Sequence, residues 1–314
     1  QLTTTMMQYI DASMVGSLGA EASAAIGLIE TTTWLMGSIC SATAAGFYVQ
    51  VSHQLGANDA AMARSTLRQG IMSVFIVSAL IGFIALAISP FLPTWLGGDS
   101  SITPTSSAYF AVIAMALPAF QFSMFGSGML RSSGNMIVPS VMSMVMMTLD
   151  VIFNFFLIFD TRTVDVLGMS LTLPGAGMGV VGAGIGTASA ELIAASITMY
   201  ILCFRNKELN LKIDCGRFLP TWDVVRRALH IGLPMGIQQT IMTSAYIVTT
   251  IIIAPLGTFA IAANSFGIIV ESLCYMPGYG VSDAATTLVG QSMGAGRHEL
   301  MKRFAWLSVA LGMG

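Results

Sequence analysis

Charged residues are scarce in this chain. Asp, Glu, Lys and Arg make up 9% of its 314 residues, whereas hydrophobic residues make up 55% and the mean hydropathy is +0.79. Soluble domains carry about 25% charged residues, so a soluble protein of this size could not cover its surface with so few. Basic and acidic side chains nearly balance, 13 against 15, which leaves no positive field for nucleic-acid phosphates. The composition excludes a soluble enzyme and a nucleic-acid partner, and it predicts an all-α polytopic membrane protein.

Motifs of cofactor, metal and nucleotide chemistry are also lacking. The four cysteines and three histidines are isolated, with no CxxC or HExxH spacing. No GxxxxGK[ST] segment is present, which excludes ATP hydrolysis through a P-loop in this chain. Residues 177–182 spell GxGxxG, but they follow a Pro-Gly loop rather than a strand, so no dinucleotide site is predicted. We therefore expect no cofactor, no bound metal and no enzymatic activity.

Long apolar runs fill most of the chain, and a spanning helix needs about 20 such residues. The charges and turns between the runs predict spans at 1–17, 22–52, 68–90, 106–130, 136–159 and 180–204, two within 228–290 that meet at 255–257, and the start of another near 304. The chain begins with Gln1 and ends inside an apolar run, so we expect a fragment that is truncated at both ends.

Basic residues divide unequally when these spans are threaded in and out of a membrane. Twelve of the thirteen fall on one side, and only Arg162 falls on the other, next to Asp160 and Asp165. Because cytoplasmic loops carry an excess of Lys and Arg, the first side is predicted to be cytoplasmic. A miscounted span would have scrambled this bias, so the division also supports the span count.

Two segments align without gaps at an offset of 238 residues (257 − 19). Residues 18–25 match 256–263, and Gly56-Ala57 matches Gly294-Ala295. The offset contains six spans, an even number, so both copies have the same orientation. Parallel repeats predict two lobes related by an axis along the membrane normal, with a substrate path between them. We expect an N-terminal six-helix lobe at 1–204, a cytoplasmic linker at 205–229 and the start of a C-terminal lobe at 230–314.

The motifs resemble those of the multidrug and toxic compound extrusion (MATE) family, in the right order along the whole chain. The matching segments are 11–19, 46–57, 182–187 and 284–296, and they look more like the DinF-type bacterial branch than the NorM-type branch. The resemblance implies two parallel six-helix bundles, the second incomplete in this chain. It also implies a secondary active antiporter of the bacterial cytoplasmic (inner) membrane that exports small cationic or amphipathic organic compounds. We expect it to exchange them for H⁺ or Na⁺ by alternating access, as a monomer in contact with membrane lipid.

Acidic groups inside spans are candidates for the coupling site, because charge inside a bilayer is expensive. Asp11 lies in the first span with Gln8 one turn away, and by resemblance it matches the family's cation-binding aspartate. Asp150 and Asn154 share one helix face, although the family often has Asn first and Asp one turn later. Thr187 would add a hydroxyl from the next helix. These oxygens suit H⁺ and Na⁺ equally. The alternatives are an outer-interface position for Asp11 and a purely structural Asp150–Asn154 hydrogen bond.

A second set of residues is expected to line the substrate cleft. Glu30 and Glu271 lie in equivalent helices of the two lobes, and Tyr275 shares a face with Glu271. Met242 stands where NorM-type members have a glutamate, so coupling is expected to rest on the first lobe. Flexible methionines suit promiscuous pockets. The alternative is that the acids are buried and hydrogen-bonded to neighbouring helices.

Glu191 and Asp283 are further intramembrane acids, and Asp283 is either a gate contact or simply hydrated.

Two other functions of the protein remain open at this point. A flippase for lipid-linked precursors would share the lobes but need a cationic cavity, and no arginine lies deep in a span. A channel would conduct without coupling and would not need the repeat.

Overall fold

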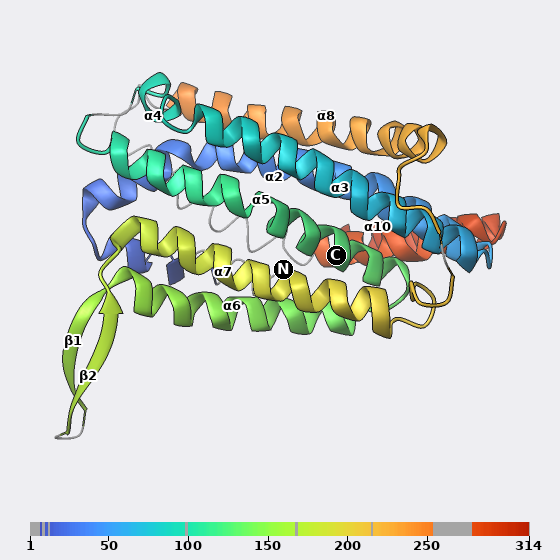
Figure 1. Ribbon diagram of the computed structural model, residues 1–314. Coiled ribbons are helices and arrows are strands. Elements are labelled where there is room, and N and C mark those ends of the chain that lie inside the picture. Colours follow the sequence, from blue (N-terminus) through green and yellow to red (C-terminus); the bar gives the residue numbers. More distant parts are fainter. Residues whose placement is uncertain are drawn as a thin grey trace.

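The computed structural model describes residues 7, 10–11, 13–97, 100–166, 169–214, 216–253 and 278–313 (Figure 1). Its elements are α2 (Ala20–Gly56), α3 (Ala60–Ile88), α4 (Leu92–Trp95), α5 (Thr103–Ser132), α6 (Ile137–Ile158), β1 (Asp160–Val166), β2 (Met169–Ala176), α7 (Gly179–Tyr200), the π-helical turn η1 (Ile201–Arg205), α8 (Trp222–Ile253) and α10 (His298–Met313). Residues 13–16 and 278–294 are also helical.

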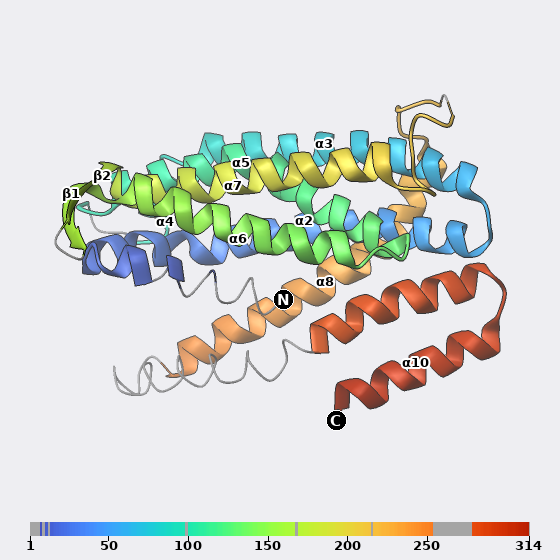
Figure 2. The same cartoon turned by 90° about the horizontal axis from the view of Figure 1, so that it is seen from below.

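Long helices lie side by side and form the body of the molecule (Figures 1 and 2). Among the described residues, α3, α5, α6 and the continuous helix 179–205 are long and apolar enough to cross a membrane. The predicted spans agree with them within a few residues, except that α3 begins at Ala60 rather than near Arg68. The Asp59 carboxylate caps α3 by accepting a hydrogen bond from the Met62 amide at 2.9 Å, and this cap stabilises the earlier turn. The fold is therefore all-α in its membrane part, as predicted.

A β-hairpin between α6 and α7 was not predicted. Strands β1 and β2 pair antiparallel, with Val166 opposite Met169 at the turn. The β-branched residues Thr161, Thr163, Val164 and Val166 were the available signal for a strand. The hairpin projects from the end of the bundle opposite the α2–α3 connection (Figure 1). It carries Arg162, so the structure agrees with the predicted separation of this residue from the other basic side chains.

The segment expected to be a linker, 205–229, is anchored on α3. Its Leu209 is fully buried, and Arg64 of α3 donates from Nη1 to the Glu208 carbonyl at 3.1 Å and pairs with Asp214. Gln69 accepts from the Thr221 amide at 2.8 Å. Helix α8 then begins at Trp222, inside the expected linker. Burial of one leucine and these polar contacts hold the connection against the first lobe.

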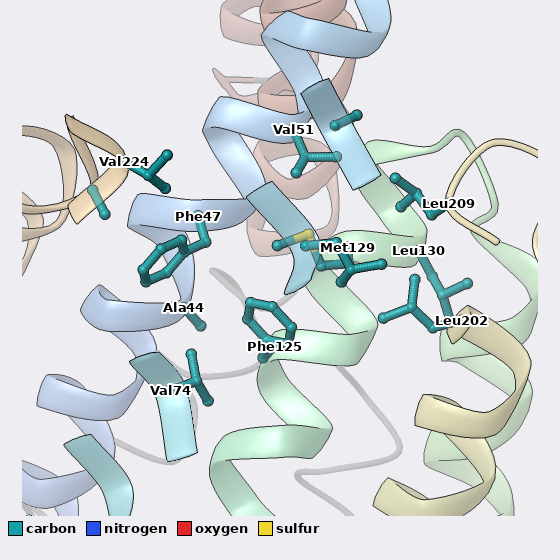
Figure 3. Packing of buried hydrophobic residues seen from close by; sticks show 13 residues of the cluster. Ala44, Phe47, Val51, Val74, Phe125, Met129, Leu130, Leu202, Leu209 and Val224 are labelled. Carbon is teal, nitrogen blue, oxygen red and sulfur yellow. The ribbon is translucent and has the colours of Figure 1, made fainter. Parts of the chain in front are cut away.

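A hydrophobic core lies below this connection. Phe47 of α2 meets Phe125 of α5 edge to face, with ring centroids 6.4 Å apart. Figure 3 shows these rings together with Leu202 of η1 and Leu209 of the connection. In a membrane, the van der Waals packing of such side chains stabilises helix contacts, because lipid is as apolar as the core. The core therefore joins α2, α5 and the 205–221 connection into one unit.

The repeat is visible as a two-fold contact. A Cβ on Gly56 would strike the backbone of Gln291, and a Cβ on Gly294 would strike the backbone of His53. Under the 238-residue offset, His53 corresponds to Gln291 and Gly56 to Gly294. The two contacts are thus the same contact made twice, which is what a two-fold axis between repeats requires. The helix 278–294 meets α2 at this axis.

Close packing of α2 on α8 depends on Gly46, since a Cβ there would strike the Ala228 backbone. We expect Gly46→Ala to destabilise the protein by about 1–3 kcal/mol, because an added methyl overpacks the contact. Thermal unfolding of the purified full-length protein in detergent would measure the change. Gly37→Ala is the matched control, because a Cβ on Gly37 of the same helix meets nothing within 4 Å. Equal effects of the two substitutions would contradict this assignment.

Candidate functional site

The side-chain amide of Asn154 joins two acidic residues. Its Nδ2 donates to Asp11 Oδ1 at 2.9 Å and to Asp150 Oδ2 at 3.2 Å. Asp150 and Asn154 are fully buried on α6, and Asp11 comes from the N-terminal helical segment. Three predicted coupling residues are therefore brought together by the fold. We call Asp11, Asp150 and Asn154 the acidic cluster.

Helix α7 approaches the acidic cluster closely because it is rich in glycine. A Cβ on Gly186 would strike the Asn154 side chain, and a Cβ on Gly182 would strike the backbone of Leu157. These glycines therefore allow α6 and α7 to pack closely. Thr187, one residue beyond Gly186, lies beside Asp150. The fourth predicted coupling residue is therefore at the cluster, and the fifth, Gln8, lies outside the described residues.

Two oxygens of the acidic cluster are left without partners. Asp150 Oδ1 and Asn154 Oδ1 are buried and accept no hydrogen bond from any described residue. Buried polar atoms normally have a partner, so each such oxygen calls for an explanation. Helices α6 and α7 contain no Lys or Arg in their sequences. Two carboxyl groups on one amide, with no basic counter-ion from these helices, are suited to hold a proton or a hard monovalent cation.

The acidic cluster lies in the half of the bundle that faces the hairpin. Asn154 is four residues before Ile158 at the end of α6, which corresponds to about 6 Å along the helix. The hairpin end is the end with the single basic residue, so it is the predicted outer side. The cluster is therefore closer to the end that is predicted to face outward than to the predicted cytoplasmic end.

Only two of the four predicted cleft residues lie in the part of the chain that the structure describes. Glu30 is an exposed residue of α2 whose carboxylate accepts from Trp34 Nε1 at 3.4 Å. Met242 is an exposed residue of α8 and lines an apolar groove on that helix with Pro234, Ile237 and Ile241. Glu271 and Tyr275 lie outside the described residues. The expected cleft role of these four residues stays a prediction.

Tyr109 of α5 is a site residue that the sequence did not indicate. It is half-buried, and its phenol lies in the electrostatic field of Asp11, Glu30 and Asp150. Its ring also packs against the glycine face of α7 at Gly184. A single tyrosine in an apolar helix carries no sequence signal, so only packing reveals that Tyr109 connects α2, α5 and α7 at the cluster.

Contacts between the lobes gather at the opposite end, which the distribution of basic residues predicts to be cytoplasmic. Asp283 pairs with Arg131 at the end of α5. Thr287 Oγ1 donates to the Arg131 carbonyl at 3.3 Å, and Gln291 Nε2 donates to the Ser132 carbonyl at 2.8 Å. Ser52 Oγ of α2 donates to the Thr287 carbonyl at 3.2 Å. The ion pair favours a contact between the lobes over simple hydration of Asp283, and a gating role stays a prediction. We call these contacts the cytoplasmic gate.

Helix α8 completes the arrangement. Close contacts tie its first half to α2, including the hydrogen bond from Gln50 Nε2 to the Val224 carbonyl at 3.3 Å. Beyond Gly236, which still contacts Ala42, α8 diverges from α2 toward the hairpin end (Figure 2). The two lobes are thus in contact at the cytoplasmic end and separate toward the other.

Two pseudo-symmetric helical lobes that touch across a two-fold axis, with a buried acidic cluster in the first, are typical of polytopic membrane transport folds with parallel repeats. The chain belongs to the MatE family, whose model matches residues 1–156 and 234–314. The predicted family is therefore confirmed, and the DinF-like branch stays a prediction.

Several relatives match most or all of the chain. A "Probable multidrug resistance protein NorM" of Thermotoga maritima is 26% identical over 92% of this chain, and one of Xanthomonas axonopodis pv. citri is 27% identical over 100%. An "FAD transporter" of Shewanella oneidensis is 26% identical over 98%. The chain spans 59%, 66% and 65% of the length of these three proteins.

Solved structures share the fold. A transporter of the MOP superfamily from Pyrococcus furiosus, described as having a binding pocket of reverse polarity, superposes with a TM-score of 0.87 at 19% identity. A multidrug resistance MATE family transporter in an outward-facing conformation superposes with a TM-score of 0.86, also at 19% identity. Each comparison covers 98% of this chain and 65% of the other. At this identity the similarity shows the fold alone.

The Arg131–Asp283 pair is half exposed, so its contribution to stability is small. We expect Arg131→Ala and Asp283→Ala to couple by about 0.5–1 kcal/mol in a double-mutant cycle of thermal unfolding in the full-length protein. A cycle of Arg297→Ala with Asp283→Ala serves as the control. Coupling equal to that of the control would mean that the ion pair does not join the lobes.

Proposed function

We propose that the full-length protein is a secondary active antiporter that exports small organic compounds in exchange for H⁺ or Na⁺. The observation that carries the proposal is the acidic cluster, with two carboxyl groups on the Asn154 amide and two buried oxygens without partners. A monovalent cation bound between Asp11 and Asp150 would give Asn154 Oδ1 a partner and would neutralise one of the two carboxylate charges. The coupling ion is left open between H⁺ and Na⁺, because carboxylate and amide oxygens accept both.

Alternating access follows from the positions of the cluster and the gate. With the lobes joined at the cytoplasmic gate, a cation arriving from outside reaches the cluster in the outer half of the first lobe. Its binding changes the charge between α6, α7 and the N-terminal helix, and a shift of these helices releases cargo outward. Opening of the gate then exposes cluster and cargo site to the cytoplasm. A potential of 100 mV supplies ~2.3 kcal/mol per charge moved.

The proposed cargo is cationic or amphipathic. Support comes from the exposed acid Glu30 on α2 and the apolar groove around Met242 on α8. The names of the relatives, two multidrug resistance proteins and one FAD transporter, describe small organic compounds of different charge. We place the protein in the bacterial inner membrane, as a monomer surrounded by lipid.

Asp11→Asn is the decisive substitution, because it keeps the size of the side chain and removes the charge that a cation would neutralise. In proteoliposomes that contain the full-length protein, we expect gradient-driven uptake of an ethidium-type cation by the wild type. We expect Asp11→Asn to lower this uptake by at least about tenfold, equivalent to ~1.4 kcal/mol of lost coupling. Separate pH and Na⁺ gradients identify the ion.

The matched control is Glu21→Gln, an exposed acid at the start of α2, which is expected to transport like the wild type. Uptake by Asp11→Asn at the wild-type rate would contradict the assigned site. Uptake of the organic cation at the same rate with and without the pH or Na⁺ gradient would favour a channel. Movement of a lipid-linked pyrophosphate without uptake of the organic cation would favour a flippase.

A further inference from the structure

Glu191 is a third buried acid in the first lobe, apart from the acidic cluster. It lies in the middle of α7 and is 6% exposed. It follows Thr187 by four residues, so both side chains lie on one face of the helix. Helix α7 packs against both α5 and α6 along its length (Figure 1). The carboxyl group therefore points into protein rather than toward lipid.

The register of α6 on α7 brings Glu191 to the level of Asp150. Gly182 faces Leu157 and Gly186 faces Asn154. The two helices are therefore antiparallel, and one turn toward the C-terminus of α7 corresponds to one turn toward the N-terminus of α6. One turn beyond Gly186 and Thr187, Glu191 reaches the turn of α6 that holds Asp150. Because side chains tilt toward the helix N-terminus, the carboxyl group leans back toward Thr187. The electrostatic interaction of Glu191 with Asp150 agrees with this register.

The groups that face Glu191 carry no positive charge. From α5, the Ser123 hydroxyl lies beside its carboxyl group, and the Tyr109 phenol lies near the cluster. The other titratable groups of this region are Asp11, Asp150 and the Glu30 carboxylate on α2. The sequences of α6 and α7 hold no Lys or Arg, and α5 holds only Arg131 in its last turn. A buried carboxylate without a counter-ion is unstable unless it binds a proton or another cation.

The acidic cluster alone does not account for this third acid. One cation between Asp11 and Asp150 neutralises one of two charges and leaves Glu191 uncompensated. Asp150 Oδ2 accepts from the Asn154 amide, whereas the buried Asp150 Oδ1 accepts no hydrogen bond from a described residue. Asp150 Oδ1 is therefore available as a ligand for a second cation. A second cation at this place would find carboxylate oxygens of Asp150 and Glu191 and the hydroxyl groups of Thr187 and Ser123.

We propose that Glu191 forms a second cation site, shared with Asp150, Thr187 and Ser123, so that the first lobe takes up two monovalent cations, H⁺ or Na⁺, in each transport cycle. This proposal rests on the antiport function proposed above. Each cation enters from the outer side, binds to carboxylate oxygens and leaves to the cytoplasm, so no bond other than O–H forms or breaks. Two coupling cations square the cargo accumulation that a given ion gradient sustains.

The test is the coupling ratio of the full-length protein in proteoliposomes. The cargo gradient at which net flux stops is measured against an imposed pH or Na⁺ gradient. We expect about two cations per cargo for the wild type and about one for Glu191→Gln, an isosteric change that retains hydrogen bonding to Ser123. Glu191→Asp is expected to restore two. A purely structural glutamate would change yield or thermal stability and leave the ratio alone, and that result would overturn the proposal.

A second measurement keeps this site separate from the antiport function. In detergent, infrared difference spectra against pH count buried carboxyl groups that bind protons, and ²²Na⁺ binding counts sodium sites. We expect Glu191→Gln to lose one carboxyl band or one bound Na⁺, and Glu21→Gln to lose neither. If the wild type shows no gradient-driven flux, the antiport proposal fails. The number of bound protons or Na⁺ ions still shows whether Glu191 forms a cation site. An unchanged count in Glu191→Gln would refute it.

Discussion

The Asn154 amide, which donates to Asp11 and Asp150 at once, is the interaction on which the first lobe depends. It joins residues 143 positions apart in the chain and requires three helices to meet at one point. That meeting is sterically possible because α7 presents Gly182 and Gly186 to α6. A larger residue at either position would separate the helices and move the amide away from the carboxyl groups. The small residues of α7 are therefore a condition for the hydrogen bonds of the acidic cluster.

The same principle acts at the other end of the molecule. Gly56 and Gly294 allow α2 and the helix 278–294 to touch across the two-fold axis, and the paired contacts repeat each other under the 238-residue offset. The surrounding polar contacts, including the Arg131–Asp283 pair, are partly exposed and individually weak. A contact made of close backbone packing and weak polar pairs can open at modest cost, which is suited to a gate.

Cluster and gate thus lie at opposite ends of a single rigid lobe. The core around Phe47 and Phe125, together with the anchored connection at Leu209, holds α2, α3, α5 and α7 as one body. Helix α5 belongs to this body and carries Arg131 at its end, so it connects the region of the acidic cluster with the contact to the second lobe. Under the proposed antiport function, cation binding at the cluster would act on that contact through this body.

Composition and local pattern determined the membrane class, the long helices, the sidedness and the repeat, because each depends on hydropathy or charge counted along the chain. The structure brings Asp11, Asp150, Asn154 and Thr187 together, and local signals indicated them, namely a shared helix face and charged groups in apolar spans. Their coupling role stays a prediction. The β-hairpin at 160–176 was missed because its strands, DTRTVDV and MSLTLPGA, lack a clear alternation of apolar and polar residues. The start of α3 was misplaced because the Asp59 cap outweighed the polar residues that follow. Tyr109 and the Arg131 partner of Asp283 had no signal at all.

Only the tertiary structure decided which groups meet across helices. In the sequence, Glu191 is one of several acids inside predicted spans. The contacts of Gly182 and Gly186 with α6 align the two helices, and this alignment brings Glu191 to the level of Asp150. Likewise, the repeat predicts two lobes, but the exchanged contacts of Gly56 and Gly294 show where they touch. The reason is physical: hydropathy and periodicity specify the faces of a helix, whereas the distance between two faces is set by side-chain packing, which no single segment contains.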